Sequence, residues 1–108
     1  LLLNGEMFTA GDTFDLTTHV WNPSIEYPVD EYLMLEVYGS YWFYPSWSQD
    51  LDVQRRLLDP GDNYQTIMRF TWPEVNGSAS GLHFFYVLAK PGTFEIVSNL
   101  AVVTFGYN

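Results

Sequence analysis

Aromatic side chains supply the most distinctive chemistry of this sequence, and they gather in the short segment from Tyr41 to Trp47. Five of its seven residues are aromatic, against 19% for the whole chain. Flat rings that stand in water bind flat partners by stacking, and a contiguous exposed apolar patch commonly marks a binding site. The segment is therefore the first candidate for a ligand-binding surface.

The residues that precede this segment predict which way its rings face. Residues 32–38 alternate in the manner of a half-buried β-strand, with Leu33, Leu35 and Val37 on one face. Continued through Gly39, the same alternation directs Trp42 and Tyr44 outward and Tyr41 and Phe43 into the core.

The outward side chains would form a planar aromatic ladder along one strand. At a rise of about 3.3 Å per residue, Tyr32 to Tyr38 spans ~20 Å, enough for several linked sugar rings. The rings would stack on the apolar faces of β-linked glucose, and polar neighbours would bind its hydroxyl groups. Trp21 joins the set because it ends a strand on an otherwise polar face. The predicted ligand-binding residues are Trp21, Tyr32, Glu36, Tyr38, Trp42, Tyr44, Trp47 and Gln49.

The same residues also have a purely structural interpretation. Aromatic side chains have high β-propensity and fill the cores of small β-sandwiches. Trp72, in phase with Phe70, is expected in the core, whereas the turn at Pro45-Ser46 leaves the direction of Trp47 open. A β-bulge at Gly39 would exchange the two faces of the strand beyond it.

The residue types that perform catalysis have no catalytic spacing here. Residues 77–81 read Gly-Ser-Ala-Ser-Gly, so alanine stands where a nucleophile elbow requires serine. His19 and His83 lack the spacing of zinc ligands or of a catalytic triad. Because the chain has no cysteine, thiol chemistry and disulfides are excluded as well. The sequence predicts a protein that is not an enzyme.

Acidic residues cluster beside predicted turns, where carboxylates are usually solvated. Calcium also prefers clustered carboxylate oxygens, so a structural calcium ion is an alternative. An EF-hand is excluded, because Arg55 stands where a loop beginning at Asp50 requires glycine. No cofactor is predicted, and the weak calcium candidates are Asp50, Asp52, Asp59 and Asp62.

Charge and length limit the partners and the architecture. Thirteen Asp and Glu against four Lys and Arg give a net charge of −9, which argues against nucleic acid as a partner. No apolar run reaches the ~18–20 residues of a membrane span. The 108 residues fit one domain, 1–108, with one core. Because the chain opens without methionine, we expect it to be part of a longer polypeptide.

Turn signals recur at short intervals and predict many short strands. The run 82–89 is nearly all apolar, as in a strand covered on both faces. In the last hairpin, the side chains expected on the inner face are Phe94, Ile96, Ala101, Val103 and Phe105. The expected strands are 13–21, 32–38, 64–72, 82–89, 93–98 and 100–107, with 51–58 as a strand or a helical turn. They predict an all-β fold, a two-sheet antiparallel β-sandwich of Ig-like or jelly-roll-like type with about seven to eight strands.

With these features the chain resembles the β-sandwich carbohydrate-binding modules appended to secreted plant-cell-wall glycoside hydrolases, such as endoglucanases. The likeness rests on size, short strands, acidic balance, absent cysteine and the ladder of Tyr32, Tyr38, Trp42 and Tyr44 with Trp47. It implies a monomeric, non-catalytic module of a secreted bacterial protein. Its partners would be a β-glucan (cellulose, mixed-linkage glucan or xyloglucan) and a tethered hydrolase.

The chain is also similar to bacterial Ig-like accessory domains. Phe14-x-Leu16, Asn22-Pro23 and the hairpin that begins at Pro91-Gly92 carry this second likeness. It implies a structural or adhesion domain whose aromatic patch contacts another protein. The two hypotheses therefore differ in the partner, a polysaccharide in one and a protein in the other.

Overall fold

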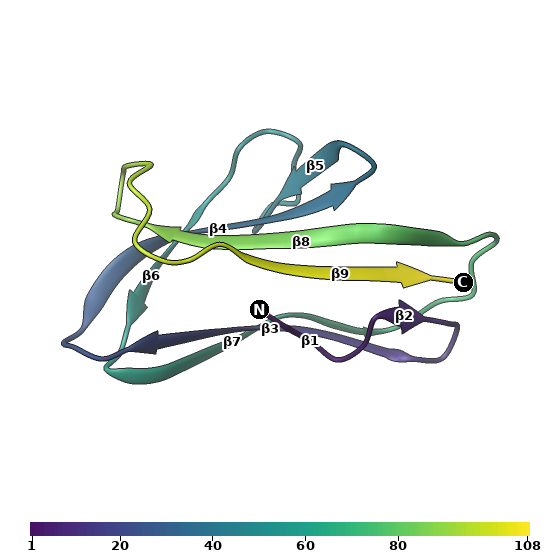
Figure 1. The fold of residues 1–108 in the computed structure, drawn as a ribbon, viewed down its shortest axis with the longest axis horizontal. Helices are drawn as coiled ribbons and strands as arrows, with labels where there is room; N and C mark the ends of the chain where they lie inside the picture. Colours follow the sequence, from purple (N-terminus) through teal and green to yellow (C-terminus); the bar gives the residue numbers. More distant parts are fainter.

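The computed structural model describes all residues from 1 to 108 and is built from strands alone. Two layers of strands lie face to face, one with β4, β8 and β9 and the other with β3 and β7 (Figure 1). The strands are β1 (Leu2–Leu3), β2 (Met7–Phe8), β3 (Thr13–Asn22), β4 (Tyr27–Val37), β5 (Ser40–Phe43), β6 (Gln54–Leu58), β7 (Gly61–Thr71), β8 (Ala79–Ala89) and β9 (Ala101–Tyr107).

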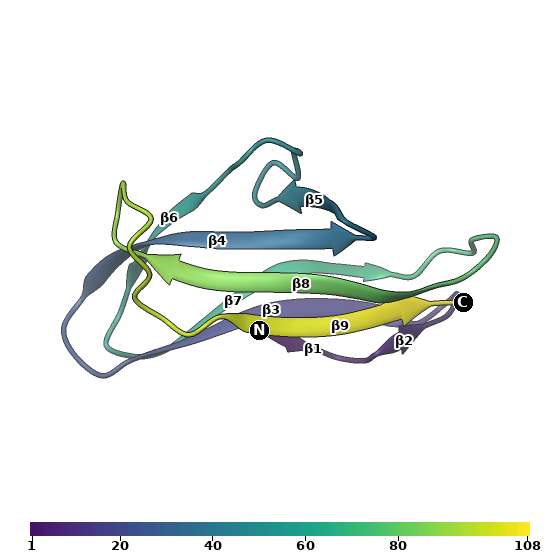
Figure 2. The same cartoon turned by 45° about the horizontal axis from the view of Figure 1, so that its top comes forward.

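The two layers are sheets of unequal size. The smaller sheet has the strand order β1-β3-β7, and the larger has the order β2-β9-β8-β4-β5, with β6 also paired to β4. The 11-residue strand β4 therefore has β8 along one side and the shorter strands β5 and β6 along the other. All pairs are antiparallel except β2 with β9. The chain crosses between the sheets after β1, β2, β3, β6 and β7. The crossing from β3 to β4 can be followed at the left of Figure 2.

The predicted all-β sandwich of two sheets is confirmed, and most expected strands are present. Strands β3, β4, β7, β8 and β9 overlap five of the predicted ranges, and the ambiguous range 51–58 contains the strand β6. The two-residue strands β1 and β2 add to the predicted number. The expected strand at 93–98 is absent, because that segment makes only one isolated bridge, between Ile96 and Ala89.

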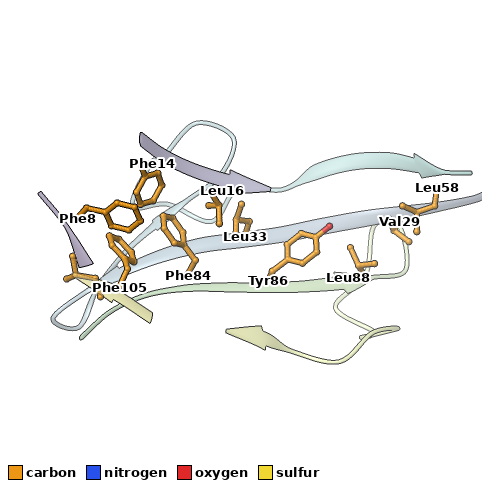
Figure 3. Close-up of a cluster of buried hydrophobic side chains, with 11 residues drawn as sticks. Phe8, Phe14, Leu16, Val29, Leu33, Leu58, Phe84, Tyr86, Leu88 and Phe105 are labelled. Atoms are coloured by element: carbon orange, nitrogen blue, oxygen red, sulfur yellow. The ribbon is translucent and has the colours of Figure 1, made fainter. Parts of the chain in front are cut away.

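One apolar cluster fills the space between the sheets (Figure 3). Alternate residues of β3 and β8 face the opposite sheet, which explains why Phe14 and Phe84 are buried. The Phe14 ring lies at the aromatic end of the cluster, 4.9 Å from the Phe8 ring and 5.6 Å from the Phe105 ring between centroids. The core residues are Phe8, Phe14, Leu16, Val29, Leu33, Leu58, Leu82, Phe84, Tyr86, Leu88 and Phe105. Trp72 packs against them, as expected.

A buried ion pair crosses the same interior. Glu31 of β4 is 1% exposed and accepts hydrogen bonds from Arg56 Nη1 at 3.0 Å and from the Tyr86 hydroxyl at 2.5 Å. Arg56 Nη1 also donates to Thr18 Oγ1 of β3 at 3.5 Å, so the network joins the two sheets. Burial and the Glu31 carboxylate raise the pKa of Tyr86, which keeps its hydroxyl protonated as a donor.

Candidate functional site

An apolar groove lies on the outer face of the larger sheet. Side chains of β4, β5 and β8 form its floor, and the β5–β6 and β8–β9 loops form its walls. The groove encloses about 230 Å³, and only Tyr32 among its lining side chains carries a hydrogen-bonding group. The lining residues are Tyr32, Met34, Phe43, Leu51, Phe85, Val87, Phe94, Ile96 and Leu100.

Strand pairing explains why the floor residues meet. Directly paired residues of neighbouring strands share one face of a sheet. Met34 of β4 pairs with Phe85 of β8 on one side and with Phe43 of β5 on the other. Its neighbour Leu33 is fully buried in the core, so Met34 and its two partners face away from the smaller sheet. Tyr32 lies on this same outer face.

A tight turn between β4 and β5 reverses the predicted facing of the aromatic segment. Val37 pairs with Ser40, so the turn consists of Tyr38 and Gly39 alone, with φ values of 48° and 87°. Positive φ at both central residues is the pattern of a type I′ hairpin. The turn places Ser40 on the face of Val37, whereas a continuous strand would have placed it on the other. Each later residue of β5 therefore faces opposite to the prediction.

Four expected orientations are consequently wrong. Tyr41 and Phe43, predicted for the core, face outward, and Phe43 lines the groove. Trp42, predicted to face outward, pairs with Leu35, which packs against the core. Tyr44, also predicted to face outward, packs against the core itself.

The level aromatic shelf expected from Tyr32, Tyr38 and Trp42 does not form. Tyr32 is half-buried on the outer face of the sheet, and Trp42 is half-buried on the opposite face. Tyr38 occupies the turn, where its side chain is 69% exposed and its hydroxyl accepts a hydrogen bond from the Ser80 N–H at 3.2 Å. The three rings therefore do not share one face of the sheet.

The remaining predicted binding residues of this region lie in different surroundings. The ring of Trp47 packs against the core, with its centroid 6.2 Å from that of Phe84. Gln49 is exposed in the β5–β6 loop. Glu36 lies on the outer face, one row along from the groove floor, and pairs with Tyr41 and His83.

Trp21 belongs to a second exposed aromatic group, on the outer face of the smaller sheet. Its side chain is 61% exposed, and that of Tyr64 on the neighbouring strand is 62% exposed. The His19 ring stacks on the Tyr64 ring at 4.5 Å between centroids and 13° between planes. Its Nε2 atom lies 2.7 Å from the Asp62 carboxylate, which orients the imidazole.

An acidic anchor holds the loop that forms one wall of the groove. Asp30 is 4% exposed and accepts hydrogen bonds from Arg55 Nε at 2.9 Å and from the Gly92 N–H at 2.8 Å. The bond to Gly92 fastens the β8–β9 loop over the outer face. Phe94 and Ile96 of this loop are 75% and 54% exposed, so their predicted inward orientation is wrong.

The Asp30 anchor predicts a pH-dependent stability. The hydrogen bonds from Arg55 and Gly92 lower the pKa of Asp30 below its ordinary value of 3.8. Since the folded-state pKa is depressed, the stabilisation is complete above the unfolded-state pKa and is lost as the pH falls through the folded-state pKa. We expect Asp30→Asn to be less stable than the wild type at neutral pH, with a difference that shrinks below about pH 4.

Urea unfolding of both proteins between neutral pH and about pH 2.5 measures this difference. Asp50→Asn is the control, because Asp50 is exposed in the β5–β6 loop. A difference between Asp30→Asn and the wild type that stays constant throughout the acid range would contradict a role for the charge.

The aspartates considered as calcium ligands do not form a metal site. Asp52 accepts hydrogen bonds from the backbone N–H groups of Ser46 and Val53. The Ser46 side chain, followed by these backbone bonds, lowers the pKa of Asp52. Asp62 is engaged by His19. No three side chains of His, Asp or Glu come together as metal binding would require. The geometry therefore gives the calcium hypothesis no support.

Sequence reasoning missed most of the groove, although one signal for it was present. Phe85 and Val87 belong to the apolar run 82–89, whose composition predicts a strand covered on both faces. The structure leaves their outer face only half-buried. Because no segment has a helical pattern that could cover a second apolar face, the run itself indicated an uncovered surface.

Comparisons with protein-family models, with curated proteins and with solved structures found no match to this chain. No helix of the length and apolar character needed to cross a membrane is present. The chain has two candidate functional surfaces, the apolar groove and the group around Trp21.

Proposed function

We propose that this β-sandwich is a non-catalytic contact module that binds another protein through its outer groove. The observation that carries the proposal is the lining, which contains nine residues and no charge. The four wall residues, Leu51, Phe94, Ile96 and Leu100, are each more than half exposed. Burying apolar surface releases about 25 cal/mol per Å², and contiguous apolar patches mark interaction sites.

The composition of the groove favours a protein over a sugar as its ligand. A sugar presents hydroxyl groups that need hydrogen-bond partners when they leave water. In the groove, the Tyr32 hydroxyl is the one side-chain group able to form hydrogen bonds with the hydroxyl groups of a sugar. Leucine, phenylalanine or methionine side chains of a partner protein meet no such cost.

The charge of the chain adds a second property of the partner. With a net charge of −9, the domain attracts a positively charged surface and repels an acidic one. We therefore propose a partner that inserts one or two apolar anchor side chains into the groove and surrounds them with Lys or Arg.

Site-specific photocrosslinking tests this function. A photoreactive phenylalanine analogue at Phe94 should crosslink to one protein in the native host, and the same analogue at Val75 should not. Val75 is exposed but lies outside the groove. Leu51→Asp, on the opposite wall, should reduce the Phe94 adduct at least about tenfold, because it places a charge against the apolar anchor.

The Leu51→Asp variant must keep the thermal midpoint of the parent for this comparison to hold. Adducts of equal yield from Phe94 and Val75, or an adduct that Leu51→Asp leaves unchanged, would contradict the proposed function.

Carbohydrate binding is a second proposal, supported by the group around Trp21. Two exposed rings, Trp21 and Tyr64, stand beside the Asp62 carboxylate, and His19 supports one of them by stacking. This combination of apolar faces and orienting polar groups suits a β-glucan better than the groove does. A secreted bacterial parent protein with a tethered glycoside hydrolase belongs to this second proposal.

Retention on β-glucan affinity gels tests the second proposal. We expect Trp21→Ala to weaken retention at least about tenfold in dissociation constant, because a stacked tryptophan dominates such a site. Phe94→Ala, on the wall of the outer groove, is the matched exposed aromatic control and should leave retention unchanged. Wild-type protein that migrates alike with and without β-glucan would remove the carbohydrate proposal.

A further inference from the structure

A row of polar side chains lies beside the floor of the groove, on the same outer face of the larger sheet. Glu36 of β4 pairs with Tyr41 of β5 on one side and with His83 of β8 on the other. His83 pairs in turn with Thr104 of β9, and its Nδ1 atom lies 2.9 Å from the Thr104 hydroxyl oxygen. Because directly paired residues share one face, the four side chains form one row across the sheet.

Glu36 is a half-buried carboxylate without an ion-pair partner. The chain has four Lys and Arg side chains, and each already forms an ion pair with a different carboxylate. The four pairs are Arg55 with Asp30, Arg56 with Glu31, Arg69 with Asp15 and Lys90 with Glu95. A Lys or Arg that pairs with Glu36 therefore comes from outside these 108 residues.

The surroundings of Glu36 suit a guanidinium group. The Tyr41 side chain is 40% exposed and stands directly beside Glu36, so a cation bound to the carboxylate also lies within reach of an aromatic ring. Arginine forms two parallel hydrogen bonds with a carboxylate and stacks on aromatic rings, whereas the lysine ammonium is a compact point charge. The pair of Glu36 and Tyr41 therefore favours arginine over lysine.

The groove and Glu36 are placed to contact one ligand. Met34 of the groove floor and Glu36 are alternate residues of β4, so they lie ~7 Å apart along the strand. Phe94 of the β8–β9 loop closes the other end of the groove, where its ring lies 6.0 Å from the Tyr32 ring between centroids. This loop lies at the left of the sheet in Figure 2, whereas β4 ends at the right. An occupant of the groove therefore extends toward Glu36.

We propose that the partner inserts an apolar side chain into the groove and places an arginine, about 7 Å farther along β4, against Glu36 and Tyr41. This inference rests on the proposed function and adds the residue that selects a charge on the partner. The net charge of −9 attracts a basic surface to the whole domain, whereas Glu36 determines where one cation binds. A second copy of the chain is a poor occupant, because its arginines are already paired and it carries the same net charge.

Two small probes test the inference on the folded domain. Phenylpropylguanidinium carries a phenyl ring and a cation at the required spacing, and phenylpropylurea is its neutral counterpart. In NMR titrations, both probes should shift the amide signals of Phe85 and Phe94, and only the cation should also shift those of Glu36 and Tyr41. We expect the guanidinium probe to bind about fivefold tighter, because a partly exposed ion pair and a cation–π contact each add a modest attraction.

Matched variants assign this preference to Glu36. Glu36→Gln should make the two probes bind equally and leave the affinity for the urea unchanged. Glu74→Gln removes the same charge from an exposed residue of the β7–β8 loop and should keep the preference. His83→Lys leaves Glu36 in place but supplies it with a cation from the neighbouring strand, so this variant should also abolish the preference.

The outcomes separate this inference from the proposed function. Probes of equal affinity that both shift the groove signals would overturn the inference and leave the proposed function standing. A preference that Glu36→Gln reduces no more than Glu74→Gln does would also overturn it, because Glu36 would then not be the site of the cation. If neither probe at millimolar concentration shifted the groove signals, the groove would accept no apolar anchor, and both the inference and the proposed function would be wrong.

Discussion

Glu31→Ala is expected to lower the free energy of unfolding by about 3–5 kcal/mol. The substitution leaves the Arg56 guanidinium, only 16% exposed, without its carboxylate, and it removes the acceptor of the Tyr86 hydroxyl. Removal of one partner of a buried pair is costly because the other charge stays out of water uncompensated. Since small domains have total stabilities of about 5–15 kcal/mol, the loss is large, and the urea midpoint measures it.

Matched variants separate the charge from the packing. Glu31→Gln keeps an acceptor for Tyr86 and removes only the charge. The double variant with Glu31→Met and Arg56→Met should be more stable than either single methionine variant, because it leaves no unpaired charge. If the loss in free energy of unfolding of the double variant equalled the sum of the losses of the two single variants, the two residues would not be coupled.

Phe14→Ala is expected to cost about 3–5 kcal/mol. The Phe14 side chain is 1% exposed and contacts aromatic rings from both sheets. They are Phe70 of the smaller sheet and Phe8, Phe84 and Phe105 of the larger. Its removal loses the transfer energy of a buried ring and leaves a cavity that surrounding β-strands collapse into only in part. Urea and thermal unfolding, with an unchanged m-value, measure the effect.

Two substitutions serve as controls for Phe14→Ala. Phe94→Ala removes the same ring from a side chain that is 75% exposed, and its effect should stay within about 0.5 kcal/mol. Phe14→Leu keeps most of the apolar volume and should cost less than alanine. Equal destabilisation by Phe14→Ala and Phe94→Ala would contradict the assignment of Phe14 to the core.

The alternation of side chains along the chain is what made the fold predictable. In β3, Phe14, Leu16 and Thr18 alternate with polar residues, and all three are buried as the pattern predicts. Trp21 is exposed on the polar face, as the same pattern indicates. Alternation is a local property, so it survives uncertainty about how the strands pair.

The facing of β5 was not predictable from alternation, because it depends on one backbone turn. A type I′ turn usually has Asn-Gly or Gly-Gly at its centre, whereas this turn has Tyr38 and Gly39. Because tyrosine is unusual at this position, the sequence does not indicate the turn. The two-residue turn places every later residue of β5 on the opposite face of the sheet from the one predicted. The predicted shelf failed for this single reason.

The predicted orientation of the groove wall was wrong for a different reason. Phe94 and Ile96 have the spacing of an inward-facing strand, but their position is set by Asp30, which lies about sixty residues earlier and bonds to Gly92. A contact between distant residues leaves no trace in local periodicity. The groove is therefore not predictable from the sequence, because its wall depends on the hydrogen bond between Asp30 and Gly92.

The separation of the groove into strand-borne floor and loop-borne walls has an evolutionary consequence. The wall residues Leu51 and Phe94 contribute nothing to the core cluster, so replacing them carries little risk to folding. Descendants of this chain can thus diverge in what they recognise through changes in two loops while inheriting an unaltered scaffold. We therefore expect amino-acid substitutions to accumulate faster in the two wall loops than in strands β4 and β8.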